Sequence, residues 1–131
     1  MSLNKQQWKK RIEIFCFIFS MIAQEETNSK KIKQQAFEKE LFQNDQMQII
    51  EYFADNRQNI IDLICKQLAP NWTWARIPQV DKAILITAYA EFSALQIDRK
   101  IIIDQAIITT KHFSEPNSVA YINAILDKII R

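Results

Sequence analysis

The sequence predicts an all-helical protein, and two observations support that prediction. Apolar residues recur at spacings of three and four along most of the chain, which is the period of an amphipathic α-helix, and no stretch alternates strictly as a β-strand would. The chain also contains no glycine, the residue on which tight hairpin turns and phosphate-binding loops depend. Hairpin-rich β folds, P-loops and dinucleotide-binding folds are therefore disfavoured.

Length and composition limit the remaining possibilities. The 131 residues are 48% apolar and 24% charged, which predicts one folded domain over residues 1–131 and not a disordered chain. A net charge of +2 is too small to attract nucleic acid to the whole protein, so such binding needs a local patch. Cys16 and Cys65 have no CxxC spacing and no nearby histidines. We expect two buried thiols in a reducing cytoplasm, with no metal and no cofactor.

The first predicted helix starts at a cap, Ser2 or Asn4, and changes from basic to apolar along its length. Its apolar run 14–23 follows three cations, so a secretory signal peptide is an alternative. That run is too short to span a bilayer, Glu13 opens it, and no clear cleavage site follows. We favour a helix in the middle of a bundle with its cationic end at the surface. Its expected inward side chains are Trp8, Ile12, Phe15, Phe19 and Ile22.

Two helices are expected next. The first covers 30–42 after the polar break 27–29. The second is capped by Asn44 and runs to about Leu68, with an interruption near Asn56, before Pro70 ends it. The first should face inward with Ile32, Ala36, Phe37 and Leu41, and the second with Ile49, Ile50, Phe53, Ile60, Ile61, Ile64 and Leu68.

The second half of the chain predicts a connector and three more helices. The connector 71–78 carries two tryptophans, and we expect it to pack across the bundle. A helix then starts at Gln79 and places Glu91 on its apolar face, where a carboxylate needs a partner. Asp98 should cap the following helix, and Ser114 or Asn117 the last.

The segment 71–128 resembles the carboxy-terminal half of the NusB family. The matching stretches are Asn71-Trp72, 76–85 (RIPQVDKAIL), Ala88 with Glu91, Asp104-Gln105-Ala106, Lys111-His112-Phe113 and 121–127 (YINAILD). No one element is specific, but their order and spacing together are. Before residue 71 the resemblance is looser, through a basic start, Arg11 and Phe19. Ala124 stands where the family usually has glycine, Ile86 where arginine is common, and the arginine cluster of the first helix is reduced to Lys9, Lys10 and Arg11.

The resemblance implies an orthogonal bundle of about six to seven helices in two small subdomains. It also implies a non-catalytic transcription antitermination factor that binds boxA-type single-stranded RNA of ribosomal RNA leaders. The implied partners are the ribosomal protein NusE and the transcribing RNA polymerase complex, in the cytoplasm and without a membrane. The oligomeric state, monomer or homodimer, stays open.

The start of the first helix is one candidate RNA-binding site, formed by Lys5, Lys9, Lys10 and Arg11. Cations there oppose the helix dipole, an arrangement that a bound phosphate would explain. From the residues alone a solvated helix end explains them equally well, and the resemblance favours RNA contact.

A second candidate is the stripe of Asn117, Tyr121, Ala124 and Lys128 on the last helix. An unstacked base can lie on the tyrosine ring while cations hold the backbone. A partly buried tyrosine beside a surface lysine is the alternative. The resemblance favours RNA, because Tyr121 takes the aromatic place of a motif implicated in boxA binding.

Five further polar residues receive mostly structural interpretations. We expect Glu91 to be a buried polar strut and Asn123 to bond the backbone near a helix junction. Asp81 has a local explanation as an acid at a helix start. Lys82 beside it is a candidate RNA contact, because the corresponding family region lies near the RNA. The lone His112 is assigned to the surface.

Two other functions remain as alternatives. The same fold can serve as a protein-interaction module whose RNA contact has faded with the thinner arginine cluster. NusB-like domains also precede ribosomal RNA cytosine methyltransferases. This sequence has no glycine-rich loop for S-adenosylmethionine, so we expect at most the RNA-binding part of such an enzyme and no catalysis.

Overall fold

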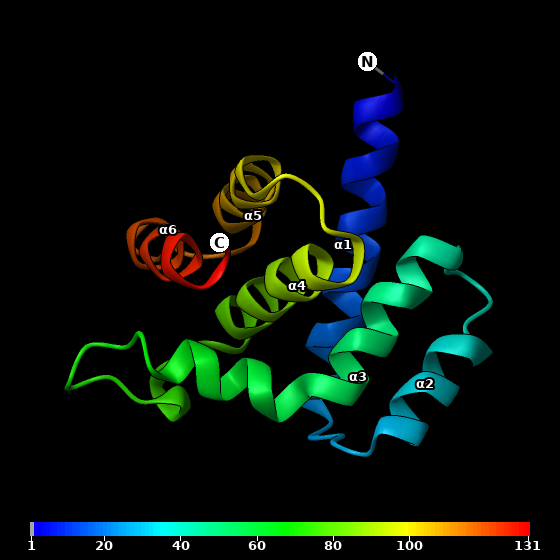
Figure 1. Cartoon of the computed structure of the whole chain (residues 1–131), viewed down its shortest axis with the longest axis horizontal. Helices are drawn as coiled ribbons and strands as arrows, with labels where there is room; N and C mark the ends of the chain where they lie inside the picture. The colour runs from blue at the N-terminus through cyan, green and yellow to red at the C-terminus, as the bar shows by residue number, and fades with distance from the viewer. Residues whose placement is uncertain (1) are drawn as a thin grey trace.

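The computed structural model describes the backbone of residues 2–131 and the side chains of residues 6–131. It is all-helical, as predicted, and the described residues contain no strand. Residues 2–131 contain six α-helices, and Figure 1 shows how they follow one another along the chain. They are α1 (Ser2–Ala23), α2 (Ser29–Glu38), α3 (Asn44–Cys65), α4 (Gln79–Leu95), α5 (Arg99–Phe113) and α6 (Ser118–Ile129), with a 3-10 turn at Trp74–Arg76.

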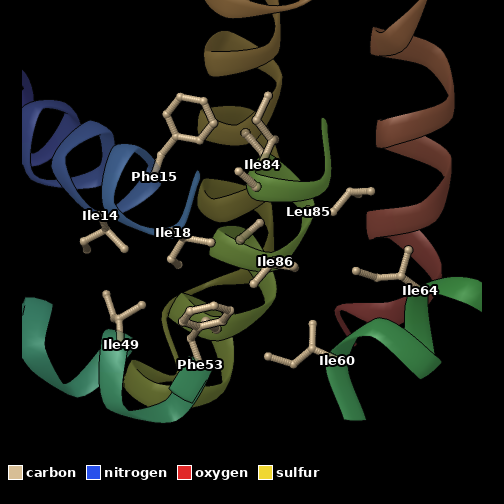
Figure 2. Packing of buried hydrophobic residues seen from close by; sticks show 14 of the residues in the cluster. Ile14, Phe15, Ile18, Ile49, Phe53, Ile60, Ile64, Ile84, Leu85 and Ile86 are labelled. Carbon is tan, nitrogen blue, oxygen red and sulfur yellow. The ribbon is translucent and has the colours of Figure 1, made fainter. Parts of the chain in front are cut away.

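Helix α4 lies at the centre of the fold. In Figure 1, α1, α2 and α3 lie on one side of it, and α5 and α6 on the other. Four successive α4 residues, from Ala83 to Ile86, are at most 2% exposed, so every side of this stretch is covered. Figure 2 shows Phe15 and Ile18 of α1 and Phe53 of α3 packed around α4. The run without charge at 83–90 therefore belongs to a helix buried all round.

The first helix is part of this core, as we favoured over the signal-peptide alternative. Ile14, Phe15, Ile18 and Met21 are each at most 5% exposed. Among the described residues 2–131, no helix is long and apolar enough to cross a membrane. The prediction that both cysteines are buried is wrong, however, because Cys16 is exposed and Cys65 is only half-buried.

Helix α2 is shorter than predicted, and two apolar residues in and just after it face outward. It ends at Glu38, and Glu40 adopts a left-handed backbone conformation with φ of 51°. Phe37 is 77% exposed, and Leu41 lies beyond the helix and is exposed as well. Both were expected to face inward. Phe42 packs instead, edge-on against Phe17 with ring centroids 5.5 Å apart.

Helix α3 has the predicted interruption. Asn56 departs from helical geometry (φ −122°, ψ 15°), and its side-chain amide donates a hydrogen bond to the Tyr52 carbonyl. The N-cap is Gln43, one residue before the expected Asn44, and its backbone N–H donates to the Gln46 side chain at 2.8 Å. The helix ends at Cys65, three residues early, because the chain then tightens into turns ahead of Pro70.

Candidate functional site

Asp81, in the first turn of α4, accepts hydrogen bonds from three hydroxyl groups. Its carboxylate is fully buried, and the Ser118 Oγ donates to Oδ2 at 2.7 Å. Ser114 Oγ donates to Oδ1, and the Tyr121 hydroxyl donates to Oδ2. Ser114 ends α5 and the other two donors lie on α6, so one carboxylate fastens the α5–α6 turn to α4. A buried carboxylate needs partners of this kind.

The Asp81 contact also fixes the side chain of Tyr121. Burial raises the pKa of the Tyr121 hydroxyl above its ordinary value, and the hydrogen bond to Asp81 raises it further. The hydroxyl is therefore held protonated as a donor, with its oxygen directed into the protein. This constraint leaves the ring in a defined position at the half-exposed surface of α6.

Trp72 stacks on Tyr121. The two ring centroids are 5.9 Å apart with 26° between the planes, an offset-stacked arrangement. Trp72 is 47% exposed and lies in the turn after α3, where its backbone N–H donates to the Ala69 carbonyl at 2.9 Å. As expected, the connector packs on other helices: Trp72 stacks on Tyr121 of α6 although it is partly exposed, and Trp74 packs against the core.

A groove of about 230 Å³ lies beside this aromatic pair, between the end of α3 and α6. Lys128 is the one charged residue in its lining, and the rest is largely apolar. We call it the aromatic groove. It is lined by Gln67, Leu68, Ala69, Trp72, Tyr121, Ala124, Ile125 and Lys128.

Two of the cations predicted to bind RNA on α1 have partners within the protein. The Arg11 guanidinium binds both carboxylate oxygens of Glu91, with Nε 3.0 Å from each and Nη2 2.9 Å from Oε2. These side chains are only 15% and 6% exposed. Glu91 is thus the buried strut that was expected, and Arg11 is its partner.

Lys10 is also paired, at the start of α3. Its Nζ lies 2.6 Å from the Asp45 carboxylate. Burial alone would raise the pKa of Asp45, but the hydrogen bond and the charge of Lys10 outweigh it and lower the pKa. Lys9 is exposed, and the side chain of Lys5 lies outside the described residues.

The two predicted halves of the site are separated by other helices. Figure 1 shows α4 and α5 between α1 and α6. The end of α5 contacts α1, where Trp8 packs against the exposed His112 with ring centroids 5.3 Å apart. The surface position expected for His112 is confirmed.

The remaining predicted contacts have different surroundings. Asn117 is exposed at the N-cap of α6, where its side chain makes no capping hydrogen bond. Lys82 places its Nζ 5.0 Å from the centre of the Trp74 ring. It lines a separate groove with Arg57 and Glu26, away from Tyr121. Asn123, expected to bond the backbone at a helix junction, is exposed because it lies on the outer side of α6.

The Asp81 cluster was not predicted from the sequence, although a signal was present. Ser118 and Tyr121 are three residues apart, which places two hydroxyl groups on one side of the last helix, and Ser114 lies just before that helix. Such a set indicates a shared acceptor. Elsewhere in residues 2–131, no group of three His, Cys, Asp or Glu side chains is placed to hold a metal ion.

Comparison with known proteins gives this fold a family. Residues 9–131 match the model of the NusB family. The chain belongs to the NusB family. Its structure superimposes on that of T. maritima NusB with a TM-score of 0.80 and 26% sequence identity, covering 94% of this chain and 89% of that one. The family resemblance identified in the sequence is therefore confirmed, together with the all-helical fold.

Curated NusB relatives match over different lengths. The Transcription antitermination protein NusB of Ligilactobacillus salivarius is 27% identical over 99% of this chain and 100% of its own length. The protein of the same name from Koribacter versatilis is 32% identical over 61% of this chain. The latter match spans 56% of that relative, so little more than half of its length is represented.

Proposed function

We propose that this NusB-family chain is a non-catalytic transcription antitermination factor of the cytoplasm, acting as one RNA-binding domain over residues 1–131. It binds boxA-type single-stranded RNA together with the ribosomal protein NusE, in the transcribing RNA polymerase complex. The observation that carries the proposal is the aromatic groove, where the Trp72–Tyr121 pair lies beside Lys128. The relatives named as transcription antitermination proteins support the same function.

The chemistry of the aromatic groove suits single-stranded RNA. An unstacked base has an apolar face that stacks on aromatic rings, and a neighbouring ammonium group neutralises phosphate. Asn117 at the start of α6 is exposed and offers an amide to a base edge. Lys9 and Lys5 supply a second, electrostatic contact from α1. Arg11, Lys10 and Lys82 contribute less, because each already interacts with a side chain of this protein.

The second candidate function is a protein-interaction module of the same fold with weak RNA binding. The pairing of Arg11 and Lys10 within the protein favours it, because those charges are partly neutralised. The exposed Phe37 and Leu41 also favour it, since large apolar side chains at the surface often contact other proteins.

Fluorescence anisotropy with a boxA-like RNA and a scrambled control separates the two functions. Trp72→Ala should weaken boxA binding by roughly 5- to 150-fold, the range for losing one aromatic stacking contact. Phe37→Ala is the control, because it removes another exposed aromatic ring, on α2 and outside the lining of the aromatic groove. Lys9→Ala should reduce the slope of log affinity against log salt by about 0.7. Lys30→Ala, another exposed lysine, should leave it unchanged.

Equal binding of both RNAs would contradict the proposal, as would equal losses in Trp72→Ala and Phe37→Ala. The experiment is repeated with NusE present, because RNA binding by the pair is part of the proposed function. Negligible binding under both conditions would favour the protein-interaction module.

A further inference from the structure

We propose that the aromatic groove holds a single unstacked nucleobase of the RNA, and that the side-chain amide of Gln67 selects which base it is. This inference rests on the proposed RNA-binding function and adds a specificity-determining residue to it. Gln67 lies outside the predicted RNA-binding residues, in the turn that follows α3.

The walls of the aromatic groove match the faces of a base. The Trp72–Tyr121 pair lines the groove, and Leu68 and Ile125 add apolar surface. The volume of about 230 Å³ is that of a small pocket. A flat, polarisable ring that stacks on the aromatic pair and displaces water from apolar walls therefore fits the groove.

The polar groups of the groove match the rest of a nucleotide. Gln67 is half-buried and carries both donors and an acceptor, the combination needed to recognise a Watson–Crick edge. Lys128 is exposed in the last turn of α6, where it can meet the phosphate. The lining contains no acidic residue to repel it, and the neighbouring Asp127 is paired with Arg99 at 2.9 Å. This charge pattern favours an anionic ligand that also carries a flat apolar ring, as a nucleotide does, over a cationic or purely apolar ligand.

Ala124 controls the space available for the base. It is exposed on α6 and lines the groove between Tyr121 and Lys128. A larger side chain at this position would fill the groove without displacing any core residue. Ala120, one turn earlier on the same helix, is equally exposed and does not line the groove. Ala124→Leu and Ala120→Leu are thus a matched pair with the same change in helix propensity.

The experiment measures the affinity of the full chain for boxA-like RNAs in which each nucleotide in turn is abasic. One abasic position should weaken wild-type binding by roughly 5- to 150-fold. Ala124→Leu should bind intact RNA as weakly as the wild type binds that abasic RNA. Its affinity should not fall further when the same position of the RNA is made abasic. Ala120→Leu should behave as the wild type does.

Gln67→Leu tests the recognition of the base edge. Each of the four bases is placed in turn at the RNA position where an abasic site weakens binding. The wild type should bind one of these RNAs most tightly. Gln67→Leu should bind all four with similar affinity, near the mean of the wild-type affinities. Gln58→Leu, an exposed glutamine of α3, is the control.

Three results would overturn the inference. The first is RNA binding in which no abasic position distinguishes Ala124→Leu from Ala120→Leu. The second is a base preference that survives in Gln67→Leu. With either of these two results, the proposed RNA-binding function stands, and only the inference that the groove selects a base is overturned. The third is the absence of boxA binding by any variant, with or without NusE, which overturns the proposed function and the inference together.

Discussion

Replacing Asp81 by asparagine tests whether one buried charge organises the helix that carries Tyr121. The substitution keeps the size and shape of the side chain and removes its charge. Three hydroxyl groups, from Ser114, Ser118 and Tyr121, now donate to the carboxylate. The asparagine oxygen can accept only part of these bonds, and its amide group faces hydroxyl groups that must rotate to accept.

The expected loss follows from the number of bonds. A hydrogen bond to a charged group contributes about 1.5–3 kcal/mol, and a neutral one about 0.5–1.5 kcal/mol, so each of three bonds weakens by about 1 kcal/mol. Part of this is offset because asparagine costs less to bury than a carboxylate. We expect Asp81→Asn to lower the free energy of unfolding by about 1–3 kcal/mol. Asp81→Ala should cost more, about 3–5 kcal/mol, because all three hydroxyl groups lose their acceptor.

Urea unfolding followed by circular dichroism measures these losses. Asp104→Asn, an exposed position on α5, is the control and should change stability by less than about 0.5 kcal/mol. A double-mutant cycle with Ser118→Ala should give a coupling energy of at least about 0.5 kcal/mol with Asp81→Asn. The reasoning is refuted if Asp81→Asn and Asp104→Asn are equally stable, or if the cycle shows no coupling.

Three further predictions concern groups that the fold has buried, paired or exposed. Arg11→Met should lower the free energy of unfolding, measured in urea, by about 3–5 kcal/mol, because it leaves the Glu91 carboxylate buried without a partner. Adding Glu91→Leu should recover most of this loss. A loss below about 1 kcal/mol in Arg11→Met would contradict the prediction. Because the pKa of Tyr121 is raised in the folded state, its contribution to stability is complete below the unfolded value of about 10 and is lost as pH rises through the folded pKa. At about pH 11, absorbance should show one ionised tyrosine fewer in the folded chain than in the chain unfolded in urea. Tyr121→Phe should remove this difference. Full ionisation of all tyrosines in the folded wild type would contradict the prediction. Cys16 should react with a disulfide reagent faster than Cys65, and Cys16→Ser should remove the fast phase, whereas equal rates would contradict the exposure of Cys16.

The helices could be predicted from the sequence because apolar periodicity is a local property. It predicted all six helices and the interruption at Asn56. It could not predict that Phe37 and Leu41 face outward, since a period shows which side chains share a face and not whether another helix covers that face. The end of α2 was missed for a related reason, because Glu40 enters the left-handed region without a glycine to mark the position.

The site was less predictable because its contacts join distant parts of the chain. The sequence showed that Glu91 needs a partner but not that Arg11, eighty residues earlier, supplies it. Tyr121 was found through the family resemblance, whereas its acceptor Asp81 already had a sufficient local explanation as an acid at a helix start. Only the packing of α6 and of the end of α5 on α4 brings the three hydroxyl groups to that carboxylate.

The pairing of Arg11 and Lys10 has a consequence for how RNA binding should depend on salt. A cation held in an intramolecular ion pair releases few counterions from RNA, so of the described cations at the start of α1 only Lys9 should contribute fully. Together with Lys5 and Lys128, the other cations of the proposed interface, Lys9 would give a slope of log affinity against log salt of roughly −2.1 for single-stranded RNA. Stacking on the Trp72–Tyr121 pair, in contrast, does not depend on counterions. We therefore expect this chain to bind boxA-like RNA mainly by base stacking, and to keep most of its affinity at salt concentrations that dissociate an arginine-rich complex. A slope several times steeper would mean that Arg11 leaves Glu91 when RNA binds.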